Sequence, residues 1–264
     1  MECELSLRGL RAAVTASTKG IGNGIARILL ECGAKVVING RTEEGVKEAL
    51  SKLSKYGDRV HGVAADLSNE GEAERFVKES VDFLGGLDAL VYVPPPVPGG
   101  RFMALGMRLW RLSYRLLIEA AIEAVSAAYS HLIDSDNASI TFITSIAAWE
   151  PLPEIATSSV LRPGLHAMTI LLARELGPDG IRVNAVIPGY IETDRLVSVA
   201  GMRAKEKGTS VDEELRKMAM RVPLGRLGDP TDIGWLVAFL ASPRATYITG
   251  ALIPVSGGLH SSVH

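Results

Sequence analysis

The chain has 264 residues, of which 47% are hydrophobic and 22% charged, so it carries enough apolar material for one large α/β domain and is not intrinsically disordered. A net charge of −2 offers no basic excess to neutralise phosphates, which excludes nucleic acid as an expected partner. No stretch reaches the roughly 18–20 apolar residues of a membrane span, and residues 1–8 lack a signal-peptide core. The two cysteines, Cys3 and Cys32, have no metal-ligand spacing. We therefore expect reduced thiols, no bound metal and a cytoplasmic location.

Residues 11–41 contain the first predicted elements, a strand, a helix and a second strand. The first strand, 12–14, leads into a turn of small residues, 15–22, which reads Thr-Ala-Ser-Thr-Lys-Gly-Ile-Gly. A helix then runs to about Cys32, and the second strand covers 35–38. Glycines at such a strand-to-helix turn let the main chain approach a pyrophosphate, which the backbone N–H groups and the helix dipole can receive. This βαβ unit predicts a dinucleotide site rather than an ordinary tight turn.

Apolar runs typical of buried strands alternate with helical patterns along the rest of the chain. The further predicted strands are 59–65, 89–93, 138–144, 181–187 and 251–255, and the clearest predicted helices are 44–53, 70–84 and 165–176. Strands that alternate with helices in this way predict an α/β fold: a Rossmann-type, doubly wound, seven-stranded parallel sheet with helices on both faces. The sequence contains no linker and no internal repeat, so we expect one domain over residues 1–264.

Two stretches differ from this alternation. Residues 93–100 contain four prolines directly after a strand, which impose an extended path and remove four N–H donors. Residues from about 194 to 220 are rich in Arg, Lys, Glu and Met, and they predict a helical insertion over the carboxyl ends of the strands, where open α/β sheets bind ligands. A solvated helical hairpin is the alternative interpretation of this insertion.

In their order along the chain, these motifs resemble those of the short-chain dehydrogenase/reductase family over essentially the whole length. The turn at 15–22 is similar to the family's Thr-Gly-x-x-x-Gly-x-Gly loop, with Ala16 in place of the first glycine. The other matches are Asp66-Leu67 after the third strand, Ser145 after the fifth, 184–193 beside the expected nicotinamide, and a C-terminal signature at 223–230 and 247–258.

The resemblance implies an NAD(P)-dependent oxidoreductase that acts on a carbonyl or a secondary alcohol, with a small molecule as substrate. It also implies a homotetramer, because the last strand and helix form one interface in this family and the long helices around 104–132 and 155–176 form another. The residues predicted to bind the cofactor are Thr15, Ser17, Thr18, Lys19, Gly20, Ile21, Gly22, Arg41, Asp66, Leu67, Pro188, Gly189, Ile191 and Thr193.

The family's catalytic positions differ in this chain. Alignment through the shared run 164–166 places Ser158 at the family's tyrosine and Arg162 at its lysine, and the asparagine position falls on Leu117. The resemblance thus implies Ser145, Ser158 and Arg162 as the catalytic residues, within a degenerate tetrad. A serine hydroxyl is far less acidic than a phenol of pKa near 10, and an arginine cannot relay protons, so we expect weakened acid catalysis.

Pro163 bears on the geometry around Ser158, because proline is tolerated in the first turn of a helix and disfavours helical angles in the preceding residue. Either the helix starts near Arg162 and leaves Ser158 in a loop, or Pro163 lies in its first turn with Ser158 just upstream. Two tyrosines are candidates for the missing acid, although a packing role is favoured for both: Tyr92 and Tyr190. Core positions are expected for Tyr114 and His166.

The end of the second strand bears on the choice of cofactor. An acidic residue there binds the ribose 2′-hydroxyl of NAD, whereas an arginine accommodates the 2′-phosphate of NADP. Residues 38–41 contain no Asp or Glu and include Arg41, and Lys19 in the glycine loop adds a second positive charge. NADP is therefore favoured, and NAD stays open. Two other functions stay open as well: a catalytically silent nucleotide-binding protein, and a non-redox enzyme that uses the same cleft.

Overall fold

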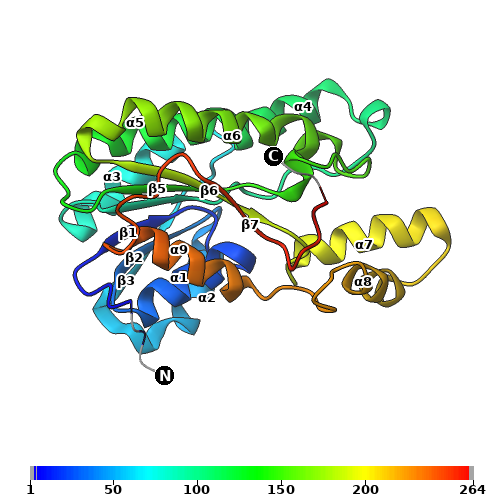
Figure 1. Ribbon diagram of the computed structural model, residues 1–264, viewed down its shortest axis with the longest axis horizontal. Helices are drawn as coiled ribbons and strands as arrows, with labels where there is room; N and C mark the ends of the chain where they lie inside the picture. The colour runs from blue at the N-terminus through cyan, green and yellow to red at the C-terminus, as the bar shows by residue number, and fades with distance from the viewer. Residues whose placement is uncertain (1–2, 4, 262–264) are drawn as a thin grey trace.

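Seven parallel strands form one sheet in the computed structural model, which describes Cys3 and residues 5–261 (Figure 1). The strands are β1 (Arg11–Val14), β2 (Lys35–Gly40), β3 (Val60–Ala64), β4 (Ala89–Tyr92), β5 (Ser139–Ile143), β6 (Arg182–Pro188) and β7 (Leu252–Val255). Their order in the sheet is β3-β2-β1-β4-β5-β6-β7, and the neighbouring pairs are parallel. The chain winds outward from β1 to β3 and then crosses back to β4, which is the doubly wound topology of a Rossmann-type sheet. The predicted fold class is confirmed.

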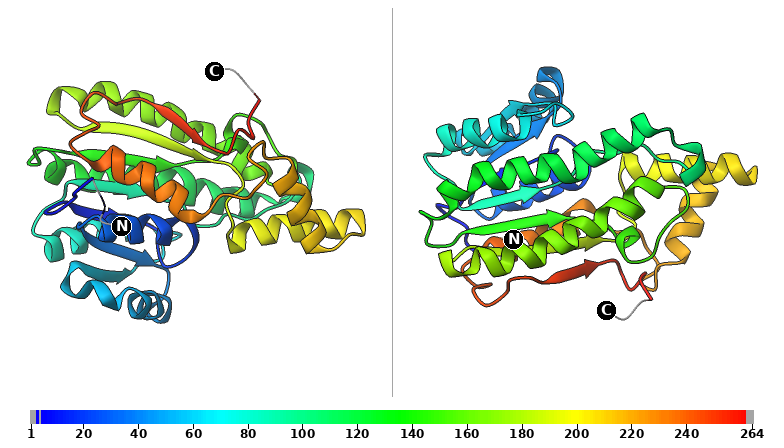
Figure 2. Two further views of the ribbon diagram at one scale, coloured as in Figure 1. Left: turned by 60° about the horizontal axis from the view of Figure 1, so that its bottom comes forward. Right: turned by 90° about the horizontal axis from the view of Figure 1, so that it is seen from above.

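Helices cover both faces of the sheet (Figures 1 and 2). One face carries α1 (Gly20–Glu31), α2 (Glu43–Lys52) and α9 (Pro230–Ala241), and the other carries α3 (Glu72–Leu84), α5 (Ala120–Leu132) and α6 (Ala156–Glu175). The further helices are α4 (Met107–Tyr114), a π-helical turn (Arg115–Glu119) that joins it to α5, α7 (Asp194–Lys207) and α8 (Val211–Met220), with short 3-10 turns at Ser54–Arg59, Phe102–Ala104, Ile146–Ala148 and Gly177–Asp179. Within the part of the chain that the structure describes, no helix is long and apolar enough to cross a bilayer.

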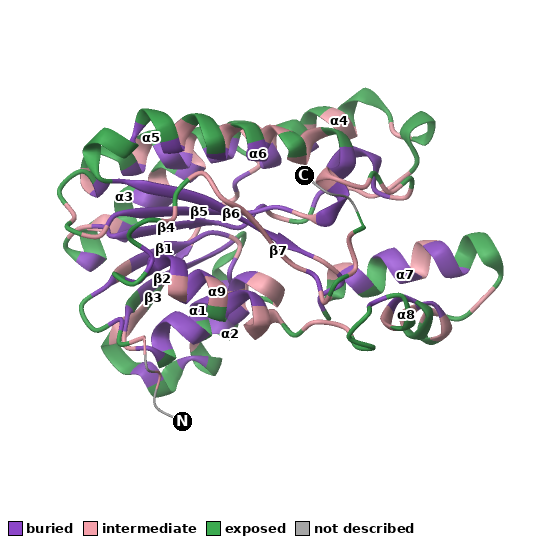
Figure 3. Cartoon of the chain, viewed as in Figure 1, coloured by how far each residue is buried: buried purple, intermediate pink, exposed green. Residues whose placement is uncertain are grey.

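The central strands are buried on both sides (Figure 3). Every residue of β4, β5 and β6 is buried, which accounts for the consecutive apolar residues in their sequences. The covering helices also pack closely on each other. At Gly24 of α1, a Cβ atom would lie 2.6 Å from the backbone of Pro230 in α9, so only glycine allows these two helices to approach as they do.

The expectation of reduced cysteines is wrong, because Cys3 and Cys32 form a disulfide with their Cα atoms 4.9 Å apart. Cys32 is the C-cap of α1, and its carbonyl accepts a hydrogen bond of 2.7 Å from the Leu7 amide. The N-terminal segment therefore turns back along the end of this helix and brings the two thiols together, a contact that composition does not reveal. The cysteines give no support to a reducing compartment, and the cytoplasmic location stays a prediction.

Asp88, just before β4, joins three parts of the fold at the amino edge of the sheet. Its carboxylate accepts hydrogen bonds from the Arg11 backbone N–H at 2.8 Å, from Arg11 Nε at 2.9 Å and from Arg11 Nη2 at 2.7 Å. The Ser135 hydroxyl donates another at 2.7 Å. Burial works to raise the pKa of the Asp88 carboxyl, but the hydrogen bonds from Arg11 and Ser135 outweigh it and hold that pKa below its usual range.

We expect Asp88→Asn to lower the free energy of unfolding at pH 7 by about 2–3 kcal/mol, because Arg11 keeps its charge and loses its carboxylate partner. A carboxyl whose pKa is depressed by folding stabilises fully above its unfolded pKa, near 4, and loses that contribution as the pH falls through the lower folded value. When urea unfolding is measured between pH 6 and pH 2.5, the free energy of unfolding should therefore fall more steeply with decreasing pH for the unaltered protein than for the variant. Asp136→Asn, at an exposed aspartate, serves as control. Parallel pH curves for Asp88→Asn and the unaltered protein would contradict the prediction.

Candidate active site

The loops that follow β1, β4, β5 and β6 gather at the carboxyl edge of the sheet, where doubly wound sheets bind ligands. Helices α7 and α8, residues 194–220, extend beyond this edge of the sheet (Figure 2). We refer to these two helices as the lid. They occupy the stretch in which the sequence predicts a helical insertion.

The loop between β1 and α1 turns at Ala16 and Gly20, which have φ values of 43° and 56°. Glycine adopts this left-handed region without strain and alanine does not, so Ala16 holds a conformation that favours glycine. Gly22 packs against the same turn, since a Cβ there would lie 2.4 Å from the Ala16 carbonyl oxygen. Lys19, the N-cap of α1, does not cap the helix with its side chain. The first-turn N–H groups are thus suited to receive an anion.

Asn39, near the end of β2, holds this loop in place. Its Oδ1 accepts the Ala16 N–H at 3.0 Å, and its Nδ2 donates to the Ala65 carbonyl at 3.0 Å. Ser17 adds two bonds, because its N–H donates to the Asn39 carbonyl at 2.8 Å and its Oγ accepts the Asn39 N–H at 2.9 Å. Sequence analysis did not assign Asn39 to the site, although a polar residue at the carboxyl end of an apolar strand is a signal for such a role.

The end of β2 touches the glycine loop. A Cβ on Gly40, the last residue of β2, would lie 2.5 Å from Thr18 Cγ2. Lys19 directly follows Thr18 in the chain, and Arg41 directly follows Gly40. Both of these residues are exposed. Two cations therefore border the same end of the loop.

Asp66 and Leu67 follow β3 at the same edge of the sheet. Ala64 at the end of β3 pairs with Gly40 at the end of β2, so Asp66 lies two residues beyond that register position. The Asp66 carboxylate accepts hydrogen bonds from the Ser68 N–H at 3.0 Å and the Ser68 hydroxyl at 2.8 Å, while Leu67 is buried. This turn lies next to the β2 end of the site.

The segment after β6 returns to the glycine loop. Pro188 is the last residue of β6. A Cβ on Gly189 would lie 2.8 Å from the Cα of Ser256, the residue directly after β7. Ile191 is buried, and Thr193 is the N-cap of α7. A Cβ on Gly20 would lie 3.3 Å from Thr193 Cγ2. The structure therefore brings the start of the lid against the glycine loop.

Residues 93–100, the proline segment, connect the glycine loop to the start of α6. The Thr15 hydroxyl donates to the Val93 carbonyl and accepts the Val93 N–H, both at 2.8 Å. At the other end, the Thr157 hydroxyl donates to the Pro98 carbonyl at 2.9 Å. The proline segment is therefore held by hydrogen bonds near both of its ends.

Helix α6 begins at Ala156, so Ser158 lies in its first turn and Pro163 lies inside the helix. Both predicted arrangements around Pro163 are wrong. The Gly100 carbonyl accepts the Ala156 N–H at 3.1 Å, so the proline segment supplies a partner for the helix start. Pro163 removes one intrahelical N–H donor, and the helix continues through it at that cost.

The three predicted catalytic residues lie at the carboxyl end of β5. Ser145 comes two residues after the strand, and its Oγ accepts a backbone N–H at 3.1 Å. Arg162 Nη1 donates to the carbonyls of Ile143 at 3.2 Å and Thr144 at 2.7 Å, directly before Ser145. Ser158 is four residues before Arg162, on the same face of α6, and is 3% exposed. The structure thus brings Arg162 to the Ser145 turn and Ser158 alongside it.

The Arg162 side chain is partly buried, and its Nε is out of contact with solvent. Burial lowers its pKa to about 10, with a further lowering from the charge of Arg195 and an opposing effect from Tyr92. Arg162 therefore stays charged at neutral pH. Arg195, the second residue of α7, was not assigned to the site from sequence; it follows β6, which pairs with β5 in the sheet.

Tyr92 is fully buried, and its hydroxyl donates to the Leu116 carbonyl at 2.7 Å. Leu116 belongs to the π-helical turn Arg115–Glu119, which also contains Leu117. Burial raises the pKa of the Tyr92 phenol far above its usual value. Tyr92 therefore packs in the core, as favoured from the sequence.

His166 and Tyr114 are two further side chains for which the sequence predicts a core position. His166 is buried, with Nε2 2.9 Å from the Thr144 hydroxyl, as expected for a core histidine. The core position expected for Tyr114 is wrong: its side chain is 45% exposed, because α4 turns this residue away from the sheet.

Two ion pairs attach α7 to the loops around the site. Arg203 pairs with Glu154, in the loop before α6, and Arg101 at the end of the proline segment pairs with Glu206. Tyr190 is buried beneath the first pair: the Arg203 guanidinium lies 5.8 Å from its ring centroid, and Arg203 Nη1 donates to its hydroxyl at 3.5 Å. The lid is thus fastened to both loops that border Ser158.

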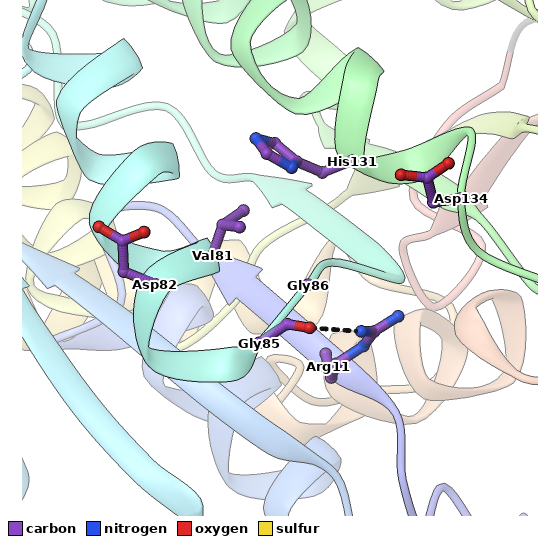
Figure 4. A pocket seen from close by; sticks show the side chains of 7 residues that line it. All are labelled: Arg11, Val81, Asp82, Gly85, Gly86, His131 and Asp134. Carbon is purple, nitrogen blue, oxygen red and sulfur yellow. Dashed lines mark hydrogen bonds between the residues drawn. The ribbon is translucent and has the colours of Figure 1, made fainter.

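Two cavities in the described part of the chain lie at opposite edges of the sheet. The larger, about 440 Å³, lies at the amino edge of the sheet, opposite the candidate site, and its Arg11 already donates to the Gly85 carbonyl at 2.9 Å (Figure 4). The smaller, about 240 Å³, lies at the base of the lid between Tyr190, Val222 and Ser256. The loops at the carboxyl edge, rather than the larger cavity, therefore define the candidate site.

Known proteins resemble this chain in both sequence and fold. A family model described as enoyl-(acyl carrier protein) reductase matches residues 15–260. Dehydrogenase/reductase SDR family member 4 of Homo sapiens is 35% identical over 251 residues, which cover 95% of this chain and 87% of that protein. The 3-oxoacyl-(acyl-carrier-protein) reductase of Aquifex aeolicus is 30% identical over 97% of this chain and 99% of its own. L-sorbose reductase from Gluconobacter frateurii, solved with NADPH and L-sorbose, matches with a TM-score of 0.91 at 28% identity and covers 99% of this chain and 100% of its own. The chain belongs to the short-chain dehydrogenase/reductase family.

Proposed function

We propose that the protein is an NADP-dependent oxidoreductase that reduces a carbonyl group or oxidises a secondary alcohol. The observation that carries this proposal is the turn between β1 and α1. The first helical turn lacks a side-chain cap from Lys19, and Gly22 lets the backbone close tightly around the loop. Such an N-terminus is suited to a diphosphate. The L-sorbose reductase that shares this fold was solved with NADPH, which supports the same class of cofactor.

The preference for NADP over NAD follows from the residues at the end of β2. Arg41 and Lys19 are both exposed there, and residues 38–41 include no carboxylate that would accept the ribose 2′-hydroxyl of NAD. Two cations at this place favour a 2′-phosphate. The orphaned N–H groups of the α1 terminus and these cations together fit the phosphates of NADP.

We further propose that the catalytic tetrad is degenerate. Ser145 retains the family's serine, while Ser158, Arg162 and Leu117 take the places of its tyrosine, lysine and asparagine. A bound nicotinamide would supply or accept the hydride. The hydroxyls of Ser145 and Ser158 can hydrogen-bond the substrate oxygen, and Arg162 adds positive charge nearby. None of these groups is a proton donor comparable to a phenol near its pKa, so turnover is slow.

The test is a titration of purified protein with NADPH and NADH, followed by oxidation of the tighter cofactor in the presence of a panel of carbonyl compounds. Saturable NADPH binding with measurable turnover supports the proposal. Failure to bind either dinucleotide would overturn it.

A second candidate function is a catalytically silent nucleotide-binding protein. The observation that favours it is the placement of the tyrosines weighed as acids: Tyr92 donates its hydroxyl to Leu116, and Tyr190 is buried under Arg203. NADPH binding without oxidation by any carbonyl in the panel would favour this alternative over the oxidoreductase.

We also propose a homotetramer, because apolar side chains are exposed on both surfaces that assemble in the family. On α5 and α6 these include Ile122, Val160 and Leu171, and Trp235 is exposed on α9. Light scattering at micromolar concentration should give four times the chain mass, and Leu171→Asp should reduce it to that of a dimer, because a charge cannot be buried in an apolar contact without large cost. A monomeric mass for the unaltered protein would exclude this assembly.

A further inference from the structure

Among the described residues, the buried side-chain nitrogen and oxygen atoms that lack a hydrogen-bond partner all belong to arginines. They are Arg115 Nε, Arg162 Nε and Arg195 Nη2. Arg115 is otherwise satisfied, because Glu123 accepts bonds from its Nη1 at 2.6 Å and Nη2 at 2.8 Å. Arg162 and Arg195 differ from it. Arg162 bonds only to backbone carbonyls, and neither residue forms an ion pair with a carboxylate in the described part of the chain. Each presents an unused N–H donor.

The two cations lie at the carboxyl ends of neighbouring strands, because Arg162 bonds the carbonyls at the end of β5, and Arg195 begins the helix that follows β6, the partner of β5. The charge of Arg195 contributes to lowering the pKa of Arg162, and burial lowers the pKa of both. Two like charges that are each partly buried, with an unpartnered nitrogen out of contact with solvent, destabilise each other and lose hydration. Such an arrangement is stabilised when a negatively charged group accepts the unused donors.

We propose that Arg162 and Arg195 form an anion-binding site at the lid side of the cleft, and that it receives the carboxylate or phosphate of an anionic carbonyl substrate. This inference rests on the proposed function, because it names the substrate class of the same cleft. A guanidinium presents a planar fork of donors that matches a carboxylate or phosphate, so two of them suit a single anionic group.

The position of the pair favours the substrate over the cofactor as the source of the anion. Arg162 bonds the carbonyls of Ile143 and Thr144, so it lies beside Ser145, where the reacting oxygen would be held. The diphosphate, in contrast, is expected at the α1 N-terminus, where Lys19 leaves the first-turn N–H groups uncapped. An anion on the arginine pair would therefore lie next to the reacting carbonyl, as in an oxoacid.

The experiment compares the unaltered protein, Arg195→Gln and Arg216→Gln, an exposed arginine of the lid that serves as the matched control. The ligands are 2-, 3- and 4-oxoacids of short chain, each paired with its neutral amide. Dissociation constants are measured by calorimetry with and without NADPH, and the affinity for NADPH is measured separately by fluorescence. These binding measurements do not require turnover.

At least one oxoacid should bind about 10–100-fold more tightly than its amide, the usual worth of a charge-assisted hydrogen bond. Arg195→Gln should remove this difference and leave NADPH affinity within about twofold, while Arg216→Gln should keep both. Equal binding of every oxoacid and its amide would overturn the proposal. A loss of NADPH affinity in Arg195→Gln, with the oxoacid preference intact, would assign the pair to the cofactor's phosphates and overturn it as well. Oxoacid preference without any NADPH binding would retain the anion site and refute the proposed oxidoreductase.

Discussion

Replacing Ser158 by tyrosine together with Arg162 by lysine should raise the rate of carbonyl reduction by about 10²–10⁴-fold, the usual contribution of a positioned acid. A lysine ammonium four residues from a tyrosine lowers the phenol pKa toward neutrality. A serine hydroxyl is far less acidic than this phenol, and an arginine, unlike a lysine, cannot relay a proton. The measurement is kcat/KM for NADPH oxidation with the best carbonyl substrate of the unaltered protein.

Two controls keep this result interpretable. Tyr92→Phe removes a hydroxyl that the structure directs to Leu116, so it should leave the rate unchanged within about threefold. Ser158 is only 3% exposed, so thermal unfolding must show that the double variant still folds around the larger ring. A folded, NADPH-binding double variant with no gain in rate would support the silent nucleotide-binding protein. A large loss of activity in Tyr92→Phe would make Tyr92 the working acid.

Arg41→Asp should weaken NADPH binding by about 10–100-fold, because it removes a charge-assisted contact to the 2′-phosphate and adds repulsion. NADH affinity should stay the same or rise, since an acidic residue at the end of β2 accepts the ribose 2′-hydroxyl. Fluorescence titration of both cofactors measures the ratio. Lys47→Asp, an equal charge change at an exposed residue of α2, is the control. Equal affinity of the unaltered protein for NADPH and NADH would show that Arg41 does not select the cofactor.

The elements that sequence predicts well are those whose pattern is local. The predicted strand boundaries agree with the structure within two residues, and the glycine loop lies between β1 and α1 as predicted. Both depend on patterns among neighbouring residues: the alternation of strand and helix, and the Gly20–Gly22 spacing. The start of α6 is different. Proline rules predict a break near Pro163, whereas the Gly100 carbonyl and the Thr157 hydroxyl, contacts with a segment over fifty residues away, allow a start at Ala156.

The same distinction applies to the site. The sequence predicts Ser145 and Arg162 from their place in a motif, but the position of Arg195 depends on the pairing of β5 with β6, so no local pattern indicates it. The Cys3–Cys32 bond and the role of Asn39 in tying β2 to the glycine loop are also contacts between segments that tertiary structure alone brings together. Sequence therefore predicts the scaffold better than it predicts the contacts between distant segments around the candidate site.

The two ion pairs of α7 have a consequence for how this helix can move. Any movement of α7 away from the two loops must separate Arg203 from Glu154 and Arg101 from Glu206. Dissolved salt screens the exposed outer pair, whereas the inner pair, with Arg203 only 8% exposed, is largely shielded from mobile ions. Where lid motion limits kcat, ionic strength will loosen the outer contact and leave an inner barrier that salt does not reach. Salt therefore weakens one of the two attachments of α7 and leaves the other in place.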